Sequence, residues 1–233
     1  MHRIFVPADT FPDIHGSDAH YIRDVLRLKA GQELVLLDGS GKSFRANILG
    51  IEKDIIKCMI VETISSDTEP QTKITLAQAL PKSKKMDLIV EKCTELGVAA
   101  IIPMLTERCI SKEINLERAK KIAKSSAQQS GRAIIPEISP LMPFKEILKH
   151  KEEYDLALIP WELEKENTLK SVLKNSAAPK KIIILIGPEG GFSQEEIALA
   201  KASDFTPVSL GKRILRTETA GMSVLSSIFY EFE

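Results

Sequence analysis

Two glycine-containing stretches near the C-terminus combine groups that could bind a ligand and react with it. The first is Gly187-Pro188-Glu189-Gly190-Gly191, and the second runs from Gly211 to Ala220. Glycine adopts backbone angles that other residues avoid, and it lets main-chain atoms approach a ligand closely. The first stretch lacks the Gly-Lys-Ser/Thr ending of a phosphate-binding loop and the spacing of a dinucleotide fingerprint. Two interpretations therefore stay open for it, a ligand loop of another kind or a tight strand-to-helix turn.

The second stretch favours the ligand interpretation. Arg213 and Arg216 flank the apolar pair Ile214-Leu215, and Glu218 follows, while Glu189 stands in the first stretch. Apolar groups and backbone amides can hold an uncharged flat ring. A carboxylate attracts a cationic centre, and arginine binds a phosphate or a developing anion.

Each stretch lies between a strand signal and a helix signal. The apolar runs 182–186 and 207–210 are typical of buried strands. Ser193 and Glu196 form a predicted capping box, and Thr217 is a predicted N-cap. Open α/β sheets bind ligands at the carboxyl ends of parallel strands, beside helix N-termini. We therefore expect the two stretches to form one composite pocket.

Upstream of the pocket, strand-like and helix-like apolar spacings alternate, which indicates an α/β domain with a doubly wound parallel sheet. Strands are predicted at 74–80, 99–105 and 155–160. Helices are predicted at 86–96, 116–126, 168–174 and 222–232, with Gly97 ending the first of them.

Residues 1–70 are predicted to form a separate, mostly β domain, and residues 71–233 the α/β domain. The polar, proline-containing segment 65–71 is the linker candidate. Strands are predicted at 3–6, 32–37, 43–51 and 54–64, with a hairpin turn at 38–41.

One helix is predicted inside this β domain, capped by Ser17, running from His20 to Leu28 and stopped by Gly31. Tyr21, Val25 and Leu28 are expected to face the strands. Arg23 and Arg27 lie four residues apart and are expected to share a face, either as a solvated stripe paired with Asp24 or as a contact surface.

Composition limits the class of protein. The 233 residues are 43% hydrophobic and carry a formal net charge of zero, so global charge does not argue for nucleic acid. Residues 73–132 nevertheless hold twelve Lys/Arg against six Asp/Glu, a basic excess that suits a polyanion or a solvated helix face. Three cysteines without CxxC spacing argue against zinc and disulfides. No apolar run reaches the ~20 residues of a membrane span, so we expect a cytoplasmic protein without a metal.

The motifs resemble those of a known family. Leu-Ile-Gly-Pro-Glu-Gly-Gly-Phe-Ser at 185–193, followed by Leu-Gly-x-Arg-Ile-Leu-Arg-Thr-Glu-Thr-Ala at 210–220, is similar to the SPOUT-class RsmE family of 16S rRNA uridine N3-methyltransferases. Segments 20–27, 82–98, 107–108 and 129–132 fit as well, so the resemblance covers the whole chain. One departure is Ser125-Ser126-Ala127-Gln128-Gln129, where the family often has Glu-Ala-Ala-Glu-Gln.

The resemblance implies a trefoil-knotted SPOUT domain with a small N-terminal PUA-like β-barrel that binds RNA. It further implies S-adenosylmethionine as cofactor, 16S rRNA of the small ribosomal subunit as partner, and a homodimer with the last helix at the interface. Two rival functions stay open: another SPOUT methyltransferase acting on tRNA or on a ribose 2′-hydroxyl, and a non-catalytic RNA-binding protein.

The same resemblance assigns candidate residues to three roles. Catalytic candidates are Arg213, Arg216, Glu218 and Glu189, with the general base open between the two glutamates and water. Cofactor contacts are expected from Leu158, Pro160, Gly187, Glu189, Gly191, Leu210, Ile214 and Leu215. RNA contacts are expected from Arg3, Arg23, Arg27, Arg108 and Arg132.

Overall fold

The structure, a computed structural model, describes residues 1–65, 67–83 and 85–233, so Ser66 of the expected linker and Lys84 of the basic segment lie outside the described residues. The chain forms two compact units. One contains residues 1–69 together with 127–135, and the other contains residues 70–126 and 136–233. The sequence predicts domains at 1–70 and 71–233, and it does not predict that residues 127–135 belong to the first unit.

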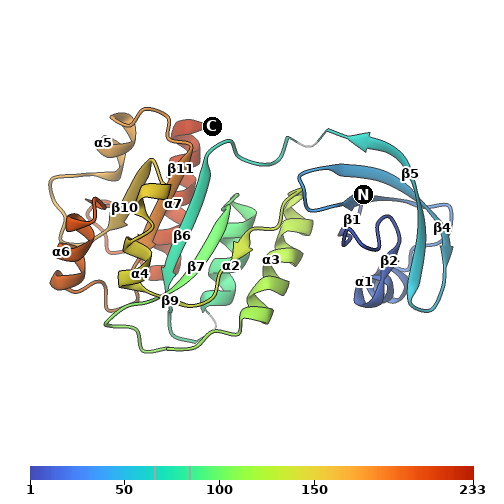
Figure 1. The fold of residues 1–233 in the computed structure, drawn as a ribbon, viewed down its shortest axis with the longest axis horizontal. Coiled ribbons are helices and arrows are strands. Elements are labelled where there is room, and N and C mark those ends of the chain that lie inside the picture. The colour runs from blue at the N-terminus through green and yellow to red at the C-terminus, as the bar shows by residue number, and fades with distance from the viewer. Residues whose placement is uncertain (66, 84) are drawn as a thin grey trace. The chain divides into compact units, whose positions relative to one another are not determined.

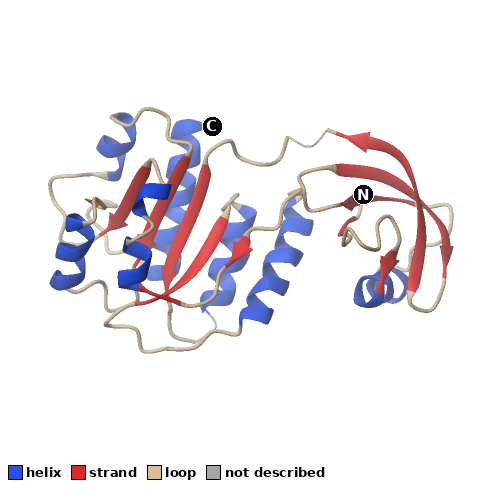
Figure 2. Ribbon diagram, viewed as in Figure 1, coloured by secondary structure: helices blue, strands red, loops and turns tan. Residues whose placement is uncertain are grey.

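The first unit is a curled five-stranded sheet with strand order β1-β3-β4-β5-β2 (Figures 1 and 2). Its strands are β1 (Arg3–Phe5), β2 (Ile14–His15), β3 (Glu33–Leu37), β4 (Ser43–Ile51) and β5 (Ile55–Ile64). The expected turn at 38–41 joins β3 to β4 as an antiparallel pair. Aliphatic side chains on one side of the sheet pack into a core around Ile4, Leu36 and Ile56.

The helix of this unit differs from its prediction. It begins at Gly16, not at a Ser17 cap, and α1 (Gly16–His20) continues as a single π-helical segment, η1 (Tyr21–Val25). Within this segment Ile22 is buried, whereas Tyr21 and Val25 are 46% and 65% exposed, so the prediction that these two face the strands is wrong.

The arginine stripe expected on this helix is therefore wrong. Arg27 lies beyond the helix with φ of 54°, so it does not share a helical face with Arg23. The expected pairing of Arg23 with Asp24 is confirmed, because the Arg23 guanidinium donates to both oxygens of that carboxylate at 2.7 Å.

Residues 127–135 are fastened to the first unit by a buried ion pair. Arg132 Nη2 donates to Glu69 Oε2 at 2.7 Å, with the two side chains 4% and 14% exposed. Glu69 Oε1 accepts from the amides of Ala133 and Ile134. Ala127 also packs beside Phe5, Val35 and Leu37 in a second small core.

The second unit is a parallel sheet with helices on both faces (Figure 2), as expected. Its main strand order is β12-β10-β11-β6-β7-β8, and β9 pairs with β7. The strands are β6 (Lys73–Ala79), β7 (Ala100–Leu105), β8 (Glu137–Ile138), β9 (Met142–Pro143), β10 (Leu156–Pro160), β11 (Lys181–Ile186) and β12 (Thr206–Val208). Five consecutive aliphatic residues fill the buried part of β11, which is typical of a central parallel strand.

The helices of this unit are α2 (Lys85–Glu95), α3 (Leu116–Ser130, which continues into the first unit), α4 (Phe144–Leu148), α5 (Leu169–Lys174), α6 (Gln194–Ala202) and α7 (Thr217–Phe232), with a 3₁₀ turn at Lys151–Glu153. Side chains of α4 and α6 pack against alternate residues of β6, β10 and β11 in one large core. Gly97 ends α2 with φ of 104°, as predicted. None of the helices in the described ranges is long and apolar enough to cross a bilayer.

The C-terminal path makes a return crossing. After central β11 the chain forms α6, reaches the edge as β12, and then comes back as α7, which packs against β6 and β11. Residues 209–216 make this crossing, and Ser209 pairs with Thr168 at the start of α5. This return is the segment that the family resemblance predicts to be threaded as a knot.

Arg132→Met should destabilise the protein by about 3 kcal/mol, because it leaves the carboxylate of Glu69 with no guanidinium in a nearly buried position. Arg45→Met is the matched control, since the Arg45–Glu62 pair is much more exposed, at 36% and 53%, and should cost less than ~1 kcal/mol. Urea unfolding followed by circular dichroism measures both. Equal losses in the two variants would contradict a structural role for Arg132.

Candidate functional site

A cavity of about 510 Å³ lies in the second unit at the carboxyl ends of β10, β11 and β12. This volume is typical of a small-molecule site. Its walls come from both predicted stretches, which confirms that they form one pocket. The lining residues are Lys85, 160–162, 186–192, 209–217 and Ala220.

The first wall is a rigid loop. Gly191 has φ of 66°, and a Cβ on it would lie 2.8 Å from Glu162 Oε1, so only glycine lets the Glu162 carboxylate approach the loop this closely. Phe192 is buried and packs against Phe144 with ring centroids 5.7 Å apart. The loop therefore has its base in the core of the sheet.

Two further contacts hold this loop to the loop after β7. The predicted capping box is confirmed, because Ser193 Oγ accepts from the Glu196 amide at 3.2 Å and Glu196 Oε2 accepts from the Ser193 amide at 3.0 Å. Glu196 Oε1 also accepts from the Glu107 amide at 2.9 Å. Arg108 Nη1 donates to the carbonyl of Gly190 at 2.8 Å.

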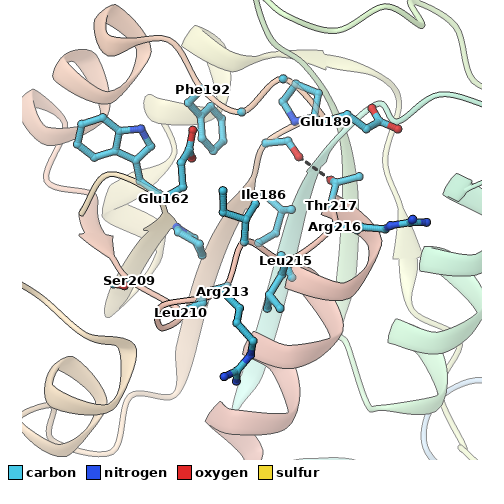
Figure 3. Close-up of a pocket in the computed structure, with 18 of the residues that line it drawn as sticks. Glu162, Ile186, Glu189, Phe192, Ser209, Leu210, Arg213, Leu215, Arg216 and Thr217 are labelled. Atoms are coloured by element: carbon cyan, nitrogen blue, oxygen red, sulfur yellow. Dashed lines mark hydrogen bonds between the residues drawn. The ribbon is translucent and has the colours of Figure 1, made fainter. Parts of the chain in front are cut away.

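The second wall is the return crossing, residues 209–217. The apolar pair expected to hold a flat ring is divided: Leu215 is half-buried beside Ile186 and Leu210, whereas Ile214 is 86% exposed. Arg213 and Arg216 are both exposed, and Figure 3 shows their side chains pointing in different directions.

Thr217 joins the two walls. It was predicted as an N-cap, but Arg216 holds that position and Thr217 is the first helical residue. Its buried hydroxyl instead donates to the Gly187 carbonyl at 2.6 Å (Figure 3) and accepts from Gln78 Nε2 at 2.9 Å. Tertiary partners have therefore replaced the local capping bond.

A three-charge cluster lies at one side of the cavity. Lys85 Nζ is 3.0 Å from Glu189 Oε1 and 3.3 Å from Glu218 Oε2. Burial disfavours the charge of Glu189, but hydrogen bonds from its own amide, from Lys85 and from the Lys82 amide outweigh this and hold its pKa below the usual range. The hydrogen bond to Glu189 in turn raises the pKa of Lys85.

The two glutamates differ in how far their oxygens are occupied. Glu189 accepts hydrogen bonds from both Lys82 and Lys85. The Glu218 side chain is only 13% exposed, and its Oε2 has no hydrogen bond of acceptable geometry, although it lies within ion-pair distance of Lys85.

Most of the residues expected at the pocket line it. They are Pro160, Gly187, Glu189, Gly191, Leu210, Arg213, Ile214, Leu215 and Arg216. Leu158 is fully buried inside β10 and Glu218 reaches the site through Lys85; neither is on the cavity wall formed by the described residues.

Ten further side chains of the wall were not among the candidate site residues, and Thr217 had been predicted only as a cap. They are Lys85, Trp161, Glu162, Ile186, Pro188, Phe192, Ser209, Lys212, Thr217 and Ala220. Trp161 and Glu162 follow β10 directly, as Gly187 follows β11, so their position after a predicted strand was an available signal. Lys85 lies in segment 82–98, which resembles the family, but no role in the pocket was predicted for it.

The arginines expected at RNA have different surroundings. Arg3 and Arg27 are exposed residues of the first unit, where Arg23 is paired with Asp24. Arg108 is exposed in the second unit. Arg132 is 3% exposed and bound to Glu69, so the structure gives it a structural contact, not an accessible guanidinium. Across the described residues no group of three His, Cys, Asp or Glu is placed to hold a metal ion.

Comparisons with known proteins agree with this arrangement. An RNA methyltransferase domain model matches residues 68–229, and an RNA methyltransferase PUA domain model matches residues 14–61. Ribosomal RNA small subunit methyltransferase E of Bacillus subtilis (strain 168) is 30% identical over 97% of this chain and 92% of its own length. The protein of the same name from Synechocystis is 39% identical over 90% of this chain and 69% of its own length.

Solved structures give the same result. A Neisseria gonorrhoeae ribosomal RNA small subunit methyltransferase E bound to S-adenosyl methionine superposes with a TM-score of 0.89, at 31% identity over 98% of this chain and 96% of the other. A Legionella pneumophila methyltransferase in complex with the same cofactor gives 0.88, at 32% identity and the same coverage. The expected fold class, a SPOUT α/β domain with a small PUA-like β domain, is confirmed. Because an RNA methyltransferase model covers most of the chain and full-length relatives reach 30% identity, this protein belongs to the ribosomal RNA small subunit methyltransferase E (RsmE) family.

Proposed function

We propose that this protein transfers a methyl group from S-adenosylmethionine to N3 of a uridine in 16S rRNA of the small ribosomal subunit. The observation that carries the proposal is the single cavity formed by both family motifs, residues 185–193 and 210–220. The named relatives and the cofactor-bound neighbours support the reaction class and the methyl donor.

The residues of the cavity fit this donor, which has a flat adenine, a ribose diol, a sulfonium cation and an amino-acid end. Ile186, Leu210 and Leu215 supply an apolar surface for the ring. Gly187 and Gly191 allow close main-chain approach, and Glu162 supplies a carboxylate for hydroxyls or a cationic group. When bound, the donor supplies an electrophilic methyl group.

The side chains of the protein must hold the uracil and remove its N3 proton. That nitrogen is a poor nucleophile while protonated, so positioning and proton transfer both contribute. We infer that Glu189 is the better placed acceptor of the two glutamates, because it lies on the cavity wall, whereas Glu218 Oε2 is buried away from the wall within ion-pair distance of Lys85. Arg213 and Arg216 would stabilise the negative charge that develops on the uracil oxygens, or they would bind a phosphate of the RNA.

RNA contacts are proposed for Arg3, Arg23, Arg27 and Arg108, mainly to phosphates, which fix register and orientation without reading sequence. Burial argues against the same role for Arg132. A cytoplasmic location follows from the proposed ribosomal substrate.

The proposed substrate is tested by nucleoside mapping in a strain that lacks the gene. N3-methyluridine should disappear from 16S rRNA, and the wild-type gene should restore it. Arg216→Ala should fail to restore it, because one cation at the mouth of the cavity is lost. Arg118→Ala is the matched control and should restore it, since Arg118 pairs with Asp87 outside the cavity wall.

Other outcomes of this mapping contradict the proposal. Loss of a tRNA modification or of a ribose methylation instead would identify another SPOUT activity. An unchanged map, together with no heat of S-adenosylmethionine binding in calorimetry, would leave a non-catalytic RNA-binding protein. Normal restoration by Arg216→Ala would remove Arg216 from the site.

Lys85→Met should move the acid limb of the pH–rate profile to higher pH. The hydrogen bond from Lys85 favours the charged form of Glu189, so its loss raises the pKa of that carboxyl and protonates this acceptor at a higher pH. Single-turnover rates between about pH 5 and 9 measure the limb. Lys92→Met is the control, because Lys92 also pairs with two glutamates on α2 but lies outside the cavity wall. An unshifted limb in Lys85→Met would contradict Glu189 as proton acceptor.

We also propose a homodimer that uses α7. Tyr230 on this helix is 91% exposed, beside a groove between α5 and α7 that Leu169 and Leu173 line. Light scattering on the purified protein should give twice the chain mass of 25.8 kDa. A monomer at micromolar concentration would refute the assembly.

A further inference from the structure

Gln78 is a fully buried amide in a strand of aliphatic residues. It lies near the carboxyl end of β6, beside Ile186 of β11 in the parallel register, and its exposed fraction is 0%. A buried amide is costly unless its polar atoms are hydrogen-bonded. The position therefore calls for a specific reason to keep glutamine instead of leucine or methionine.

The contacts of Gln78 form a relay that ends at the cavity. Gln78 Nε2 donates to Thr217 Oγ1 at 2.9 Å and to the Ala79 carbonyl at 3.0 Å. Thr217 Oγ1 then donates its one hydrogen to the Gly187 carbonyl at 2.6 Å. The relay thus runs from the sheet through α7 to the loop 187–191.

The direction of this relay fixes the orientation of the Gln78 amide. Because the Thr217 hydrogen goes to Gly187, Thr217 can only accept from Gln78, and the amide must present its nitrogen. Gln78 Oε1 is then left without a hydrogen-bond partner among the described residues. The fold tolerates an unsatisfied buried oxygen and keeps the relay.

The relay connects the two walls of the cavity. Gly187 belongs to the first wall, and Thr217 ends the second wall at the start of α7. Gly221, one turn further along α7, packs against the same strand, and a Cβ there would be in ordinary van der Waals contact with Leu76 and Gln78 Oε1, at 3.5 and 3.6 Å. The separation of the walls is therefore set by side chains behind the cavity.

We propose that Gln78 and Thr217 are positioning residues for the methyl-donor site, acting in series to hold the Gly187 carbonyl and the 209–217 segment at the spacing the donor requires. This inference rests on the proposed function for the identity of the ligand. Without the hydroxyl, the loop must be ordered at the moment of binding, and affinity falls by the cost of that ordering.

Thr217→Val keeps the shape of the side chain and removes the hydroxyl, whereas Thr217→Ser keeps the hydroxyl. Calorimetry with S-adenosylmethionine, well below the unfolding temperature, should give a Kd about tenfold higher for the valine variant and nearly unchanged for the serine variant. The rate constant at saturating donor should change little. Thr219→Val is the control, since Thr219 is exposed in the same helical turn.

If Gln78 acts through Thr217, substitutions at the two residues should not have additive effects on the Kd, which gives a second test. Gln78→Met should also raise the Kd, and the double variant should be no weaker than Thr217→Val alone. Additive losses would overturn the relay. So would a wild-type Kd in Thr217→Val with only a lowered melting temperature, which is the result expected of a purely structural bond.

A ligand-free measurement separates this inference from the proposed function. Amide hydrogen exchange at Gly190 and Gly191 should become faster in Thr217→Val and stay as in the wild type in Thr217→Ser. If the wild-type chain does not bind the donor, the proposed function fails while this test still judges the relay. Unchanged exchange in Thr217→Val would overturn the relay even if the donor binds.

Discussion

The return of α7 from the edge of the sheet to its centre is the constraint on which the site depends. The chain leaves central β11 through one loop and comes back from β12 along residues 209–216, so both passages begin at the carboxyl end of a parallel strand. The Thr217–Gly187 hydrogen bond closes this path. A cavity bounded by two such passages forms only after the sheet has been assembled, because neither passage encloses it alone.

Charged side chains of both signs lie at the cavity. One ammonium group faces two carboxylates, which leaves a net negative cluster at one side of the cavity, while Lys212, Arg213 and Arg216 also line the wall. Such a cluster favours a cationic ligand, and the sulfonium of the proposed donor is one. The same cluster includes Glu189, a carboxylate on the cavity wall that could receive a proton. Binding and proton transfer would then share one set of groups.

Local signals in the sequence predicted those parts of the fold that local physics decides. The aliphatic run of β11, the capping box at Ser193 and the glycine ending α2 were all recoverable. The predictions failed where distant partners decide. The Thr217 hydroxyl donates to the carbonyl of Gly187, thirty residues away, and does not cap the helix. Lys85 donates to Glu189, which is 104 residues away in the sequence. The π turn after α1 likewise leaves no mark in the apolar spacing.

Residues 127–135 belong to the first unit, and this limits which segments of the chain could be exchanged between relatives. These nine residues complete a core that Phe5, Val35 and Leu37 begin, and Arg132 neutralises Glu69. A fragment cut at the linker would expose that apolar surface and leave a carboxylate unpaired. Exchange of residues 1–69 alone between relatives would therefore separate them from the segment that completes their core. In this fold a segment that follows most of α3 in the sequence is thus an integral part of the unit that begins the chain.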